Sequence, residues 1–123
     1  MQKLNSLNLI GLIYEKRLIT KTSKIKFKPF DNYGNVFKVM DWHKITYDKK
    51  IGQGSYILKI KPNTRTPYHK HTNYEEFCIL DGKLIDKDNT KLNKGDFVSY
   101  KPGSNHSSYA KTDCKLLVFM RKK

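Results

Sequence analysis

Apolar and polar residues alternate over short runs from about Asn35 to the C-terminus, and turn-favouring residues separate these runs. No stretch of helical periodicity lasts longer than a few turns. Alternation of this kind places one face of each strand in a core and the other in solvent, so the pattern predicts an all-β chain. The expected strands are Val36–Met40, Lys44–Tyr47, Ser55–Lys61, Glu76–Leu80, Lys83–Asp86, Phe97–Tyr100, Ser107–Tyr109 and Lys115–Met120.

The strongest local turn signal is Asp81-Gly82, which lies between the apolar runs Phe77–Leu80 and Lys83–Ile85. A type I′ hairpin needs positive φ at both central residues, and Asp-Gly adopts such angles at low cost. We therefore predict a two-residue hairpin at this point. Several short strands at this spacing favour a β-sandwich or a β-barrel.

The N-terminal part of the chain fits this pattern of short alternating strands less well. Leu4–Ile19 is compatible with a short amphipathic helix or with an extra strand. Ser23–Lys28 alternates Ile25 and Phe27 with lysines, which favours an edge strand protected by its charges. We expect residues 1–30 to form an N-terminal extension and residues 31–123 to form one barrel. A chain of 123 residues is long enough for one such domain.

Basic residues outnumber acidic ones by 25 to 11, giving a formal net charge of +14. Such a charge raises the question of a nucleic-acid or membrane partner. Only Arg17, Arg65 and Arg121 are arginines, although arginine is the residue best suited to bidentate phosphate recognition. The lysines are also dispersed along the chain. We interpret them as a solvated surface and expect neither partner. No apolar run approaches the roughly 18 residues of a membrane-spanning helix, and no signal peptide is expected.

The two cysteines, Cys78 and Cys114, lie in apolar strand-like runs and form no C-x-x-C pair. We expect both to be small buried hydrophobic residues in a reducing, cytoplasmic compartment.

The candidate chemistry lies with three of the four histidines. His69 and His71 occupy positions i and i+2, which share a face on an extended segment, and Glu75 follows four residues later. His106 comes directly after a Pro-Gly turn in the second half of the chain. If the strand of His106 lies beside the first segment, three imidazoles and a carboxylate converge. This donor set suits one divalent transition metal, Zn, Fe, Mn or Ni, and leaves positions open for a small molecule.

These residues carry a resemblance to the cupin family. The stretch Asn63–Gly82 resembles the first cupin motif, with His-x-His, Glu and Gly at the family's offsets, and Gly95–His106 resembles the second. Asn63 stands where the family usually has Gly, which is tolerable because Asn enters the left-handed region readily. Pro102 directly precedes Gly103, and Ala110 replaces a frequent Asn. None of these departures removes a ligand.

The resemblance implies a double-stranded β-helix, a jelly-roll barrel with a short N-terminal extension. It also implies that the ligands are His69, His71, Glu75 and His106, with Glu75 preferred to Glu76. N-terminal additions in this family commonly join a dimer, so a homodimer is expected. The tandem glutamates, the Pro-Gly-Ser-Asn-His turn and the apolar ending Cys114–Phe119 are most similar to one subgroup. It contains the zinc-binding domain of ChrR-type anti-sigma factors and the acetylacetone-cleaving dioxygenase.

Two functions follow from this resemblance, and the sequence does not decide whether the protein is an enzyme. The first is a metal-binding cupin acting on a small organic molecule, with dioxygenase-like chemistry as its most concrete version. The alternative is a non-catalytic zinc-binding sensor or interaction module. Weaker candidates for substrate contact are Arg65, which is alternatively a solvated side chain, and Tyr56 and Tyr100, which are either core or pocket wall. His43 has no second ligand nearby and is interpreted as a surface or core-edge residue.

Overall fold

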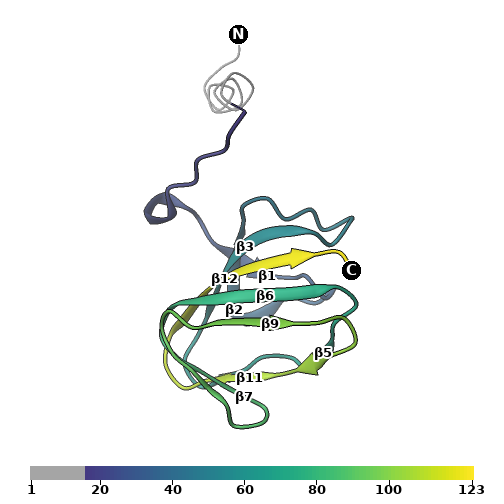
Figure 1. Cartoon of the computed structure of the whole chain (residues 1–123). Coiled ribbons are helices and arrows are strands. Elements are labelled where there is room, and N and C mark those ends of the chain that lie inside the picture. The colour runs from purple at the N-terminus through teal and green to yellow at the C-terminus, as the bar shows by residue number, and fades with distance from the viewer. Residues whose placement is uncertain (1–15) are drawn as a thin grey trace.

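The computed structural model describes residues 16–123, which form an all-β fold with one 3-10 turn (Figure 1). The elements are η1 (Thr22–Lys24), β1 (Lys28–Phe30), β2 (Phe37–Lys44), β3 (Gly54–Ile60), β4 (Thr64–Arg65), β5 (His69–Lys70), β6 (Tyr74–Asp81), β7 (Leu84–Asp86), β8 (Lys91–Leu92), β9 (Phe97–Tyr100), β10 (Asn105–His106), β11 (Ser108–Ala110) and β12 (Cys114–Arg121). The predicted all-β class is confirmed.

The strands form three antiparallel sheets whose order identifies a jelly-roll barrel. A six-stranded sheet has the order β1-β2-β3-β12-β6-β9, and a four-stranded sheet has the order β4-β11-β7-β8. A two-stranded sheet joins β10 to β5. In Figure 1 the larger sheet forms the upper layer, and β5, β11 and β7 form the lower one. Because many sheet neighbours are distant in sequence, the two halves of the chain meet inside the barrel.

The core lies between these layers and follows the alternation in the sequence. In β6, Phe77 and Ile79 are buried, and in β12 Leu116 and Val118 are buried from the same side. Trp42 of β2 joins the same core cluster. Burial of such side chains stabilises the fold by about 1.5–3 kcal/mol each relative to exposure.

The expected strand Lys44–Tyr47 is wrong. The chain instead continues β2 without a break to Lys44, because Trp42 keeps the alternation by pointing inward. The backbone N–H groups of the next three residues, 45–47, all contact the carbonyl oxygen of Ser55 at 3.0–3.1 Å. Three donors converging on one acceptor make a turn and not a ladder.

The predicted two-residue hairpin at Asp81-Gly82 is also wrong. The strands on either side belong to different sheets: β6 pairs with β12 and β9, whereas β7 pairs with β11 and β8. Gly82 has φ +83°, but Asp81 does not share the positive φ of a type I′ turn. Asp81 instead accepts a hydrogen bond from the backbone N–H of Gly82 at 3.1 Å. The pair therefore marks a crossover between layers.

The expected edge strand Ser23–Lys28 is replaced by η1 and the shorter strand β1, which begins at Lys28 and does lie at the sheet edge. Ile25 and Ile57 line the same surface pocket, and the Lys59 ammonium lies 4.7 Å from the centre of the Phe27 ring. These contacts hold the segment against the sheet face, where it cannot pair as a strand.

Most of Leu4–Ile19 lies outside the described residues, and residues 16–19 carry no helix or strand. The division into residues 1–30 and 31–123 stays a prediction. Within residues 16–123, the structure contains no helix long and apolar enough to cross a membrane.

The two cysteines differ in their surroundings. Cys114 is buried as expected, and burial, with the nearby charge of Asp81, raises the pKa of its thiol to about 12. Cys78 is only half-buried, because the alternation that turns Phe77 and Ile79 inward turns Cys78 outward. Neither cysteine is part of a disulfide.

Candidate metal centre

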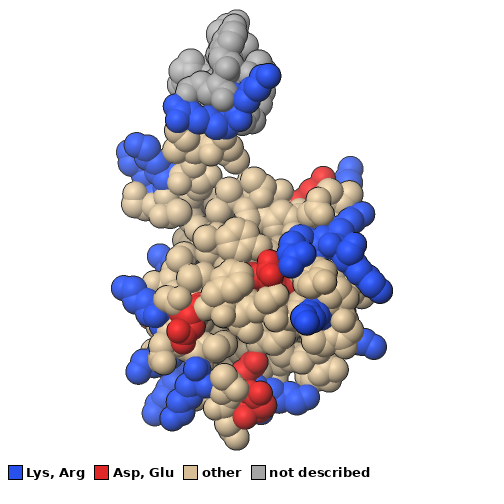
Figure 2. All heavy atoms as spheres, in the orientation of Figure 1, with Lys and Arg blue, Asp and Glu red and all other residues tan. Residues whose placement is uncertain are grey.

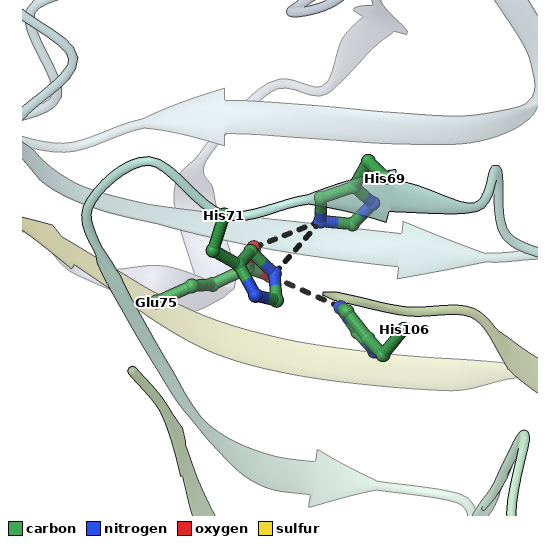
Figure 3. A group of neighbouring side chains, drawn as sticks. All are labelled: His69, His71, Glu75 and His106. Carbon is green, nitrogen blue, oxygen red and sulfur yellow. Dashed lines mark hydrogen bonds and ion pairs between the residues drawn. The ribbon is translucent and has the colours of Figure 1, made fainter. Parts of the chain in front are cut away.

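Three histidines and one glutamate meet where the six-stranded and two-stranded sheets adjoin (Figure 3). His69 lies on β5, His71 follows it, Glu75 lies on β6 and His106 lies on β10. The register of β10 against β5 places His106 directly opposite His69. The four side chains point toward one another in Figure 3, as the sequence spacing predicts for strands lying side by side.

The turn before His106 ties the two motifs together. Gly103 has φ +91° and donates its backbone N–H to the carbonyl oxygen of His71 at 2.8 Å. The backbone N–H of His71 donates a hydrogen bond to the carbonyl oxygen of Ser104 at 2.7 Å. The expected left-handed conformation of Asn63 is confirmed, with φ +58°.

The ligand-type atoms lie within 4.8 Å of one another. Glu75 Oε1 is 2.8 Å from His71 Nε2 and 3.0 Å from His69 Nε2, and these two nitrogens are 3.0 Å apart. Glu75 Oε2 is 3.8 Å from His106 Nε2. Two atoms bound to one ion at about 2.1 Å lie about 3.0 Å apart when they subtend a right angle. Most of these separations therefore match a shared ion.

Each histidine uses its other ring nitrogen, Nδ1, on a partner outside the cluster. The His69 Nδ1 lies 3.0 Å from the carbonyl oxygen of Pro67, a pure acceptor, so this nitrogen carries the proton. The His71 Nδ1 lies 3.0 Å from Ser104 Oγ, whose own proton goes to the carbonyl oxygen of Lys101. The serine hydroxyl therefore accepts from His71.

His106 is held by Asp86 and Tyr100. Its Nδ1 lies 3.4 Å from Asp86 Oδ1, and the same carboxylate accepts hydrogen bonds from the hydroxyls of Tyr100 and Ser108. The Tyr100 ring stacks on the imidazole, with centroids 4.0 Å apart. The carboxylate thus fixes the proton on Nδ1, a common arrangement around metal-binding histidines.

With all three protons on Nδ1, the centre of the cluster holds three imidazole lone pairs and a carboxylate. These groups only accept hydrogen bonds, so a cation or added protons must lie between them. His106 Nε2 is buried and has no hydrogen-bond partner among the described residues. Such an orphaned nitrogen fits a metal ligand, and the donor set suits a divalent transition metal.

The charge distribution agrees with this geometry. Burial favours the neutral form of Glu75, but its contacts with His106, His69 and His71 outweigh burial and hold its pKa well below the usual range. Burial likewise works against a charged His69, yet the hydrogen bond and charge of Glu75 raise the pKa of His69 above its ordinary value. A carboxylate therefore keeps its negative charge among three imidazoles, and added protons or a bound cation would compensate that charge.

A cavity of about 30 Å³ adjoins the cluster, with room for one or two water molecules. His69, Glu75 and His106 form its polar side, and Tyr56 lines it together with apolar core residues. Tyr33, on the loop between β1 and β2, also lines the cavity, and its ring lies 5.1 Å from the His69 ring. Tyr33 is 41% exposed, so this ring stands between the cluster and solvent.

The weaker sequence candidates fall in different places. Tyr56 is buried in the core and lines the cavity, and burial followed by the charge of Glu75 raises its pKa well above 10. Tyr100 contacts Asp86 and His106 as described. Arg65 is exposed, stacks its guanidinium on Tyr109 at 5.6 Å and does not line the cavity.

Outside the cluster, His43 contacts the Lys26 carbonyl oxygen at 3.1 Å. Glu76, the residue that was not preferred as a ligand, lies outside the cluster and contacts Arg121 at 3.1 Å and Ser99 at 2.8 Å.

Three residues of the site are missed by sequence reasoning: Asp86, Ser104 and Tyr33. Ser104 belongs to the Pro-Gly-Ser-Asn-His turn that the sequence identifies before His106, so its proximity to the cluster was predictable. Asp86 and Tyr33 come from distant loops and strands, and no motif connects them to the histidines.

A jelly-roll barrel with a cluster of three histidines and one glutamate between its strands defines the protein as a cupin. A model of the ChrR Cupin-like domain matches residues 15–123, so the chain belongs to that family. No curated protein matches the chain.

Solved structures with the same fold carry several different functions. One is Rhodobacter sphaeroides SigE in complex with the anti-sigma ChrR, at 17% identity and TM-score 0.64, covering 89% of this chain and 55% of that chain. Another is an acetylacetone dioxygenase from Acinetobacter johnsonii, at 12% identity and TM-score 0.67, covering 85% and 74%. The polyketide cyclase RemF from Streptomyces resistomycificus has 20% identity and TM-score 0.68, covering 85% and 78%. At these identities the likeness concerns the fold.

Proposed function

We propose that the protein binds one divalent transition metal through His69, His71, Glu75 and His106 and presents it to a small organic molecule. The observation that carries this proposal is that three imidazole Nε2 atoms and one carboxylate face a common centre. The Nδ1 atom of each imidazole contacts a partner outside the cluster. When bound, such an ion supplies a Lewis-acidic centre with positions open to a chelating ligand.

The chain's own residues define how a ligand reaches this centre. The cavity beside the cluster is lined mainly by apolar side chains and holds no more than a few non-hydrogen atoms as it stands. A larger ligand must displace Tyr33, whose ring covers His69. Dioxygenase-like chemistry on a small dicarbonyl or phenolic compound is the most concrete form of this proposal.

The test is oxygen uptake by protein loaded anaerobically with Fe(II), measured over a panel of small 1,3-dicarbonyl and phenolic compounds. We expect uptake that consumes one of these compounds and that is lost in Glu75→Gln. Glu76→Gln is the matched control, because its carboxylate faces outward to Arg121 and Ser99. Equal uptake by both variants contradicts a role for the cluster.

The second candidate is a zinc-binding sensor or interaction module, and the small cavity is the observation that favours it. A small, mainly apolar pocket suits a site that holds its metal without turnover. Zinc that stays bound through purification, together with no reaction across the whole panel, supports this function over the enzymatic one.

A further inference from the structure

A groove of about 910 Å³ lies at one end of the four-stranded sheet, away from the metal cluster. Lys83 precedes β7, Lys91 lies on β8, Lys94 follows β8, and Lys111 lies in the loop between β11 and β12. The antiparallel pairing of β7 with β8 and β11 brings these segments together. We call this feature the lysine groove.

The lysine groove has no acidic side chain in its lining. Among the residues that the structure describes, none of the four groove lysines forms an ion pair with a carboxylate, whereas Lys49 pairs with Asp31. Three acids lie near the groove without lining it: Asp96 accepts a hydrogen bond from the backbone N–H of Asn93, and Asp81 and Asp113 line a second groove. Four lysines therefore share one concave surface whose own lining holds no carboxylate.

A second groove on the same protein shows that this imbalance is local. That groove is lined by three lysines and three aspartates: Lys59, Lys61, Lys115, Asp41, Asp81 and Asp113. Its charges balance, whereas those of the lysine groove do not. Figure 2 shows basic side chains in separate groups around the face in view, with fewer acidic ones among them. The lysines that are dispersed in sequence are thus not evenly compensated in space.

The lining of the lysine groove also indicates the class of partner. It contains no arginine and no aromatic residue, whereas nucleic-acid sites usually use arginine to bind phosphates and aromatic side chains to stack on bases. Ile85, which is half-buried, adds an apolar side chain to the floor of the groove, whereas Leu84 beside it is buried in the core. Apolar floor and basic rim together are complementary to an extended peptide that carries acidic and apolar side chains.

We propose that the lysine groove binds an acidic peptide segment of a partner protein. This inference is independent of the metal proposal, since none of the four lysines lines the cavity beside the cluster.

The probe is a fluorescent peptide of about 12 residues, mainly Glu and Asp with interspersed Leu, measured by anisotropy at an ionic strength of about 0.15 M. The whole chain is used as purified, with no metal added. The variant Lys83→Gln/Lys91→Gln/Lys111→Gln removes three groove charges. Its matched control, Lys59→Gln/Lys61→Gln/Lys115→Gln, removes three charges from the balanced groove and lowers the net charge equally.

We expect the groove variant to weaken binding at least about tenfold and the control variant to change it by less than about twofold. Equal weakening in both variants overturns the proposal, because it shows attraction to net charge alone. Absence of peptide binding at this ionic strength also overturns it. A single-stranded oligonucleotide of equal charge is measured in parallel, and tighter binding of the oligonucleotide at the same lysines assigns the groove to nucleic acid instead.

Discussion

At the scale of single residues, the cluster depends on which nitrogen of each imidazole carries the proton. Pro67, Ser104 and Asp86 each hold one Nδ1–H, and all three Nε2 lone pairs are left for the centre. Two of these partners are a carbonyl and a hydroxyl, and only Asp86 is charged. Asp86 is therefore the partner whose removal alters the electrostatics most.

Asp86→Asn tests this positioning role. The amide keeps an acceptor for Tyr100 but loses the negative charge beside His106, so the preferred proton position on that imidazole weakens. We expect metal affinity to fall by about 10–100-fold, measured by competition with a chelator, while the circular dichroism spectrum stays unchanged. Asp88→Asn is the control, because Asp88 is exposed and its carboxylate contacts the backbone of Thr90. Equal affinity in the two variants contradicts the role of Asp86.

The pH dependence follows from the raised pKa of His69. Its folded-state pKa exceeds the unfolded value of about 6.5, so in metal-free protein the His69–Glu75 pair stabilises the fold fully below that value. This contribution is lost as pH rises through the folded-state pKa. Metal binding has the opposite dependence, because the ion must displace these protons.

We therefore expect the Tm of metal-free protein to fall as pH rises through the interval above about 6.5, while the increase in Tm caused by added metal grows. Thermal unfolding at several pH values, with and without metal, measures both quantities. A metal-induced increase that stays constant over this interval counts against the competition between protons and metal.

At the scale of elements, Gly82 shows how the chain passes between layers. A Cβ at this position would overlap the backbone carbonyl oxygen of Asp113 and lie 2.9 Å from the Cα of Cys114. Gly95 has a similar φ of +92°, but nothing lies within 4 Å of its Cβ position. The two glycines therefore share a left-handed backbone conformation, which would be strained with a side chain, and they differ in how closely other atoms approach.

Gly82→Ala is expected to lower the free energy of unfolding by about 2–5 kcal/mol, because both strain and overlap must be relieved. Gly95→Ala is expected to cost only about 1 kcal/mol from the left-handed conformation. Urea denaturation of the two variants measures the difference. Equal losses would contradict the close approach of Gly82 to the loop before β12.

The element scale also shows what the sequence could predict. Alternation located β3, β6, β9 and β12 to within a residue or two, since each presents one face to the core. It could not show that Asp81-Gly82 joins different sheets, because a hairpin and a crossover use the same turn residues. The ligand-type residues were found because His-x-His on a strand shares a face, whereas Asp86 and Tyr33 reach the site through tertiary contacts that leave no spacing signal.

At the scale of the whole molecule, the proposed metal site and the lysine groove lie in separate regions of one barrel. The cluster joins β5, β10 and β6, so a bound ion would link both motifs of the chain. The lysines that give the net charge of +14 are dispersed along the sequence, but four of them gather around a groove whose lining holds no carboxylate. The homodimer and the cytoplasmic compartment stay predictions.

The most direct test of the central claim is the metal content of protein purified without an affinity tag, measured by inductively coupled plasma mass spectrometry. His69→Ala and His106→Ala each remove one cluster nitrogen, and His43→Ala removes a histidine outside the cluster. We expect about one divalent metal per chain in the wild type and in His43→Ala, and a large loss in both cluster variants. Unchanged metal content in His69→Ala and His106→Ala would contradict the account.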